Sequence, residues 1–86
     1  MGSQSFDDRL RLAALVLRIA ATKAMGIHRT QLEKLTVQKH PRQCATHGKF
    51  EGCFGFLTRN GYLIRVCRGV YKVSSDGVKF MEGAPK

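Results

Sequence analysis

The sequence predicts one small α+β domain, mainly α-helical, in which three helices precede a two-stranded β-hairpin and a short C-terminal helix. Apolar residues at helical spacing predict the helices. Two short runs of strand-forming residues around Arg68-Gly69 predict the hairpin. The 86 residues, of which 43% are apolar and 24% charged, suffice for one core. We therefore expect a single domain over residues 1–86, with flexible tails at 1–4 and 83–86.

The first predicted helix begins after Ser5, where Asp8 completes a capping box, and runs to about Met25. Gly26 then ends it with a left-handed cap. Its surface is apolar except for a narrow arc of Arg11, Arg18 and Thr22. A helix that is apolar nearly all round is buried nearly all round. Later helices could wrap it within one chain, but we favour a homodimer that buries Leu12, Leu15, Val16 and Ile19.

The second predicted helix follows directly and is capped by His28 or Thr30. Its short core face consists of Leu32 and Leu35. The segment 36–48 is ambiguous, because a helix could open at Pro41 or a loop could precede a helix capped by Thr46.

The third predicted helix begins at His47 or Lys49 and ends at Asn60, before a Gly61 cap. One face carries the residues expected in the core: Phe50, Cys53, Phe54 and Leu57. The opposite face carries Glu51, Gly52, Gly55, Thr58 and Arg59. Because two glycines on that face have no side chain, another backbone could approach the helix closely.

The predicted hairpin pairs Cys67 with Val70 across the turn, so regular pairing places Arg65 opposite Lys72. One face is then wholly apolar and consists of Ile64, Val66, Tyr71 and Val73. The other face is basic, with Arg68 at the tip. Like charges opposite each other destabilise a sheet by up to about 1 kcal/mol. A basic hairpin therefore indicates a bound anion such as a nucleic-acid backbone.

Positive charge is concentrated in the middle of the chain. The net charge is +9, and residues 34–72 hold eight basic residues against Glu51 alone, a net of +7. The eight are Lys34, Lys39, Arg42, Lys49, Arg59, Arg65, Arg68 and Lys72. Such clustering is typical of a protein that binds a polyanion, although a basic surface can also serve solubility alone.

The residues Leu57–Ile64 (LTRNGYLI), the return strand Gly69–Val73 (GVYKV) and Ser74 or Ser75 before Gly77 resemble the winged helix-turn-helix family of DNA-binding domains. The resemblance covers about Ile27–Met81. It implies that the third helix lies in the major groove and that the hairpin, the wing, touches flanking phosphates or the minor groove. Family members often join the second and third helices by fewer residues than this chain has.

The resemblance, carried over by position, implies a set of DNA-contacting residues. The wing would contribute Arg65, Arg68 and Lys72. The third helix and its approach would contribute Lys39, Arg42, Gln43, Thr46, His47, Lys49 and Arg59. Arg42 and Gln43 can pair bidentately with guanine and adenine edges, whereas lysines suit phosphates. We therefore predict a homodimeric, sequence-specific protein that binds double-stranded DNA, a transcriptional regulator of repressor type.

The alternative is a winged helix module that binds RNA or a protein. RNA recognition favours exposed aromatic side chains for stacking, and the aromatic residues here are expected to be mostly internal. No catalytic constellation, phosphate-binding loop or carboxylate pair is present in the sequence, so we predict no enzyme, cofactor or small-molecule substrate.

Four potential zinc ligands occur in the spacing H-x3-C-x2-H-x5-C, at His40, Cys44, His47 and Cys53. Because Cys53 falls on the apolar face of the third helix, we predict no metal site and leave zinc as the alternative. The three cysteines, an odd number, suit reduced thiols. No apolar run approaches the roughly 20 residues of a membrane span. We expect a cytoplasmic, nucleoid-associated protein.

Overall fold

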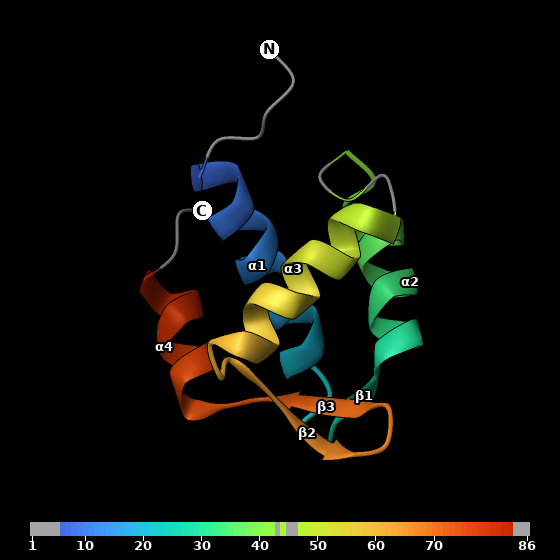
Figure 1. The fold of residues 1–86 in the computed structure, drawn as a ribbon, viewed down its shortest axis with the longest axis vertical. Helices are drawn as coiled ribbons and strands as arrows, with labels where there is room; N and C mark the ends of the chain where they lie inside the picture. The colour runs from blue at the N-terminus through green and yellow to red at the C-terminus, as the bar shows by residue number, and fades with distance from the viewer. Residues whose placement is uncertain (1–5, 43, 45–46, 84–86) are drawn as a thin grey trace.

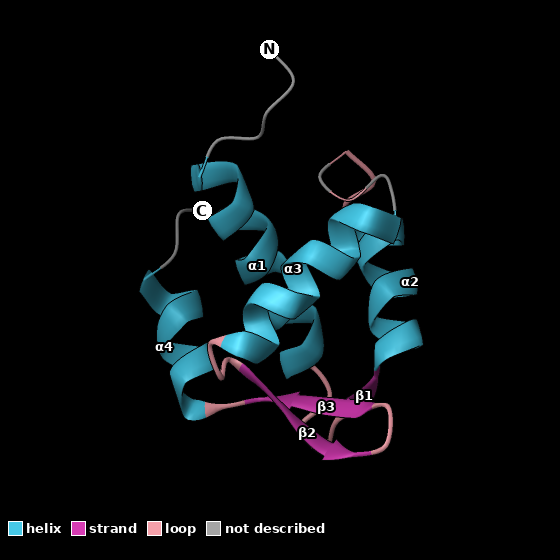
Figure 2. Cartoon of the chain, viewed as in Figure 1, coloured by secondary structure: helices cyan, strands magenta, loops and turns pink. Residues whose placement is uncertain are grey.

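The computed structural model describes residues 6–42, 44 and 47–83; residues 1–5, 43, 45–46 and 84–86 lie outside the described part. Within it, the chain forms four α-helices and one three-stranded antiparallel sheet (Figures 1 and 2). The helices are α1 (Phe6–Ala21), α2 (Arg29–Lys39), α3 (His47–Arg59) and α4 (Ser75–Gly83). The strands are β1 (Ile27–His28), β2 (Leu63–Cys67) and β3 (Val70–Val73). This arrangement confirms the mainly α-helical α+β class.

The central element is α1, which contacts α2, α3, α4 and β3. Arg11 and Arg18 are exposed, as the narrow polar arc predicted. Leu12, Val16 and Ile19 are only 3%, 0% and 5% exposed and belong to the chain's own core, while Leu15 is partly buried. The other elements therefore wrap α1 within one chain, and the residues predicted for a dimer interface do not form a free face.

The predicted first helix is too long, because α1 ends at Ala21. The Thr22 hydroxyl donates to the Ile19 carbonyl at 2.6 Å and marks this end. Gly26, at φ 120°, then turns the chain into β1, a strand that the sequence did not predict. Ile27 of β1 pairs with Tyr71 of β3 and is 2% exposed. The hairpin is therefore part of a three-stranded sheet in the order β1-β3-β2.

The second and third helices lie close to their predicted positions. His28 occupies the cap position of α2 without a side-chain hydrogen bond. Pro41 and Arg42 form a turn, so the alternative of a helix that opens at Pro41 is wrong. The predicted cap at Thr46 lies outside the described residues. After α3, Gly61 adopts φ 74°, as a left-handed helix cap requires.

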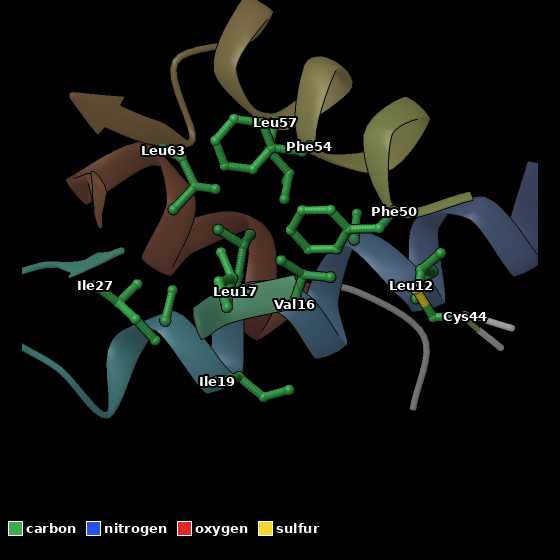
Figure 3. Close-up of a cluster of buried hydrophobic side chains, with 13 residues drawn as sticks. Leu12, Val16, Leu17, Ile19, Ile27, Cys44, Phe50, Phe54, Leu57 and Leu63 are labelled. Carbon is green, nitrogen blue, oxygen red and sulfur yellow. The ribbon is translucent and has the colours of Figure 1, made fainter. Parts of the chain in front are cut away.

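The predicted core face of α3 is confirmed. Phe50 and Leu57 are 0% exposed and Phe54 is 7% exposed, while Cys53 packs at the edge of the core. Figure 3 shows the three buried side chains directed toward Val16 and Leu17 of α1. Leu32 of α2 is also fully buried. The sheet contributes Ile27 and Leu63 to the same cluster.

The hairpin register differs from the regular pairing that the sequence predicted. Cys67 lies opposite Val70 as expected, but a bulge between Arg65 and Cys67 shifts the remaining pairs by one residue. Arg65 therefore lies opposite Tyr71, and Lys72 lies opposite Ile64. The expected Arg65–Lys72 pairing and the wholly apolar hairpin face are both wrong. Ile64 and Val66 are 41% and 48% exposed.

The C-terminal helix is joined to the end of α3 through Ser74. Its backbone N–H donates to the Tyr62 carbonyl at 3.0 Å, and its hydroxyl donates to the Gly61 carbonyl. The same hydroxyl accepts the N–H of Gly77 at 3.1 Å, which caps α4. Gly77 is buried, and α4 continues to Gly83, where the sequence predicted a tail. Among the described helices, none is long and apolar enough to cross a membrane.

Candidate nucleic-acid interface

Exposed basic side chains occur at the end of α2, on α3 and on the hairpin. Lys39 ends α2, Arg42 lies in the following turn, and Lys49 and Arg59 lie on α3. All four are exposed, as are the hairpin residues Arg65, Arg68 and Lys72. Gln43 and Thr46, and the side chain of His47, lie outside the described part of the structure. We call these seven described residues the basic surface.

The exposed side of α3 carries two glycines, Gly52 and Gly55, that differ in what lies over them. A Cβ atom added at Gly52 would have no heavy atom within 4 Å. A Cβ atom added at Gly55 would lie 3.1 Å from the terminal guanidinium nitrogen Nη1 of Arg59, so this side chain turns back along the helix surface. The face therefore combines accessible backbone at Gly52 with a basic group against Gly55.

The bulge distributes the hairpin charges over both faces of the ribbon. Successive residues of a strand point to opposite faces, so Arg65 shares a face with Tyr71 and Lys72 shares the other with Ile64. The Arg65 side chain extends across the bulge, where its Nε donates to the Cys67 carbonyl at 3.4 Å. Arg68 lies exposed in the turn. The hairpin thus presents cations in several directions rather than on one basic face.

Arg29, which sequence reasoning did not single out, connects α2 to α3. Its guanidinium forms an ion pair with Glu51 and is 5.8 Å and 5.3 Å from the ring centroids of Phe50 and Phe54. Glu51 is the sole acidic residue between positions 34 and 72. Its charge is therefore offset by a residue outside that segment, which leaves the positive field of the basic surface less attenuated.

Cys44, Cys53 and Cys67 are free thiols. No group of three potential ligands comes together among the side chains that the structure places. Burial, with a smaller contribution from Cys44, raises the pKa of the Cys53 thiol to about 12. Burial also raises the pKa of Cys44, which Glu33 raises further and Lys49 partly lowers. These two thiols therefore behave as small apolar groups at neutral pH, whereas Cys67 is exposed.

The aromatic side chains mostly contact one another. Tyr71 packs edge-on against Phe54, with ring centroids 4.8 Å apart. Tyr62 stacks on Phe80 at 4.7 Å, beside Phe56. Because these rings are partly buried and already paired, they offer limited area for stacking unpaired bases.

Comparisons of the chain with protein-family models, curated proteins and solved structures found no match. The function is therefore inferred from the residues themselves and from their arrangement.

Proposed function

We propose that this protein is a winged helix-turn-helix DNA-binding protein that acts as a transcriptional regulator. The observation that carries the proposal is the basic surface on α2, α3 and the hairpin, whose segment holds one acid, already paired with Arg29. A second support is the order of the elements, in which α2 and α3 are followed by a hairpin and a short helix. A helix and a basic ribbon that project from one core can contact a groove and its flanking phosphates together.

In this proposal the open side of α3 faces the major groove of double-stranded DNA. The backbone at Gly52 allows close approach, and the Arg59 guanidinium lies against the helix at Gly55. Base reading is assigned to the approach to α3, where Arg42 is exposed and able to contact a guanine edge. Arg65, Arg68 and Lys72 of the hairpin contact phosphates. Duplex DNA is favoured over single-stranded RNA because the aromatic rings are engaged in internal contacts.

The test is a selection from random duplexes, with single-stranded RNA as competitor and salt varied. We expect one enriched duplex sequence and an affinity that falls steeply with salt. A palindromic enriched sequence would indicate that two copies bind together, through a surface other than the buried α1 residues. Preferential binding of the RNA competitor would contradict the proposal.

A pair of substitutions separates base reading from phosphate contact. Arg42→Ala should reduce discrimination between selected and random duplexes by about 1–3 kcal/mol. Arg68→Ala should weaken both duplexes equally and lower the salt slope by about 1. Lys79→Ala, an equal charge change at an exposed position of α4, is the control. Equal effects of the first two substitutions on both duplexes would refute this division of roles.

A further inference from the structure

Arg29, the first residue of α2, contacts the two other elements that carry the basic surface, α3 and the hairpin. Its backbone N–H donates to the carbonyl of Gly69, in the hairpin turn, at 2.9 Å. Its guanidinium forms an ion pair with Glu51 of α3 and lies over the rings of Phe50 and Phe54. One residue at the start of α2 therefore contacts the tip of the hairpin with its backbone and the first half of α3 with its side chain.

A second contact closes this connection. Phe54, one of the rings under the guanidinium, packs edge-on against Tyr71 of β3. Tyr71 in turn pairs with Ile27 on one side and Arg65 on the other. A continuous path of contacts thus runs from the Gly69 turn through Arg29 to Phe54 and back to the hairpin through Tyr71. The hairpin is held against α3 at its tip and at its middle.

The Arg29 side chain is committed to these protein contacts. It is 27% exposed, and its charge is paired with Glu51. Moving the guanidinium to a phosphate would leave Glu51 without this partner and would uncover the two phenylalanine rings. Although Arg29 is basic and adjoins the basic surface, it is therefore poorly suited to contact DNA itself.

We propose that Arg29 is a positioning residue that fixes the hairpin relative to α3, so that both contact the same duplex. This inference rests on the proposed DNA-binding function. Arginine is suited to the role because its planar group can pair with a carboxylate while it stacks on aromatic faces. A lysine at this position would keep the charge but lose the planar stacking, and a methionine would keep only the apolar stem.

The test is a double-mutant cycle that combines Arg29→Met with Arg68→Ala. In the wild-type background, Arg68→Ala lowers the slope of log affinity against log salt by about 1, because one phosphate contact is lost. In the Arg29→Met background, the backbone bond from Arg29 to Gly69 remains, but the side-chain contacts with Glu51, Phe50 and Phe54 are lost. The tip of the hairpin is then less firmly fixed relative to α3, so Arg68→Ala should lower the slope by clearly less than about 1. General destabilisation by Arg29→Met would leave the Arg68 effect at full size, and that result would overturn the inference.

Two further variants keep the test decisive. Arg29→Lys should retain part of the Arg68 effect, because the ion pair with Glu51 persists. If Arg29→Met does not fold, Glu51→Gln replaces it in the cycle, since it removes the ion pair and leaves the stacking in place. A full Arg68 effect in the folded Glu51→Gln variant would also overturn the inference.

A measurement without DNA separates this inference from the proposed function. Residual dipolar couplings of backbone amides report the orientation of β2 and β3 relative to α3 in the free protein. We expect a reoriented or more mobile hairpin in the folded variant that breaks the side-chain contacts. Unchanged couplings would overturn the inference even if DNA binds. Absence of duplex binding by the wild type, with altered couplings in the variant, would refute the proposed function and leave the positioning role intact.

Discussion

Gly52→Ala and Gly77→Ala make the same chemical change in two helices and should have opposite effects on stability. Gly52 is exposed in the middle of α3, and an added Cβ atom would meet no heavy atom within 4 Å. The substitution therefore contributes helix propensity alone, worth about 1 kcal/mol. For a domain of this size, that gain should raise the melting temperature by about 4–8 °C.

Gly77 is buried in α4, where an added Cβ atom would overlap the Tyr62 carbonyl oxygen and lie 2.8 Å from Cγ1 of Val73. The carbonyl cannot move freely, because it accepts the N–H of Ser74 at 3.0 Å. Either α4 shifts or that hydrogen bond breaks. We expect a loss of about 1–3 kcal/mol, as for other overpacked sites, in spite of the gain in helix propensity.

Thermal and urea denaturation followed by circular dichroism measure both effects against the wild type. A Gly52→Ala protein no more stable than the wild type would refute the exposed placement of this side of α3. A Gly77→Ala protein of unchanged stability would refute the close contact between α4 and the Tyr62 backbone. Because the two variants differ in sign, a general response of the chain to alanine cannot account for both outcomes.

Gly52→Ala also tests the proposed DNA contact. If the open side of α3 enters the groove, the new methyl group occupies space needed by the duplex. The variant should then bind the selected duplex about tenfold more weakly, equivalent to ~1.4 kcal/mol, while it melts at a higher temperature. Unchanged or tighter binding by the stabilised variant would refute this orientation of α3.

Two further predictions concern the cysteines. The Cys53 thiol stays protonated in the folded protein to about pH 12, against an ordinary pKa of 9.0, so the unfolded chain loses this proton first as pH rises. The contribution of this thiol to stability should therefore be fully present below pH 9 and decline toward pH 12. Urea unfolding of the wild type and of Cys53→Ala at pH 8 and pH 10.5 measures this decline. An equal loss of unfolding free energy between the two pH values in both proteins would contradict it. In a thiol-labelling time course at pH 8, exposed Cys67 should react in the native protein and buried Cys44 only after denaturant is added. Rapid native labelling of a Cys67→Ser variant would refute this assignment.

The helices could be predicted from the sequence because their signals are local. The α3 core residues recur at helical spacing, and Gly61 supplies the conformation that ends the helix. The strand β1 gave no comparable signal. It has two residues, and its extended conformation depends on pairing with β3, which lies far along the chain. A segment of that length has no periodicity to detect.

The hairpin shows how one inserted residue changes a conclusion about charge. The Arg68-Gly69 turn fixed the pair nearest the tip, and regular pairing from there placed Arg65 opposite Lys72. The bulge shifts the register, and the two charges lie on opposite faces. These residues give no strong sequence signal for a bulge, so the register shift could not be predicted. The inferred repulsion between Arg65 and Lys72 was therefore wrong. The basic character of the hairpin remains. Three of the four α1 residues expected at a dimer interface, Leu12, Val16 and Ile19, lie in the chain's own core for a related reason: how much of a helix its own chain covers depends on tertiary packing.

The candidate interface was predictable in its charge but not in its organisation. Lysine and arginine side chains are costly to bury. A cluster of them in the sequence therefore indicates basic residues at the surface even before the fold is known. Which basic residues are able to contact phosphates depends on the tertiary structure. Arg29 and Glu51 are far apart in sequence, and counting charges treats them as two independent solvent-facing groups. Their pairing removes one cation from the set available to phosphates and offsets the sole acid in the basic segment. The surface therefore gains in positive field from a residue that does not itself belong to it.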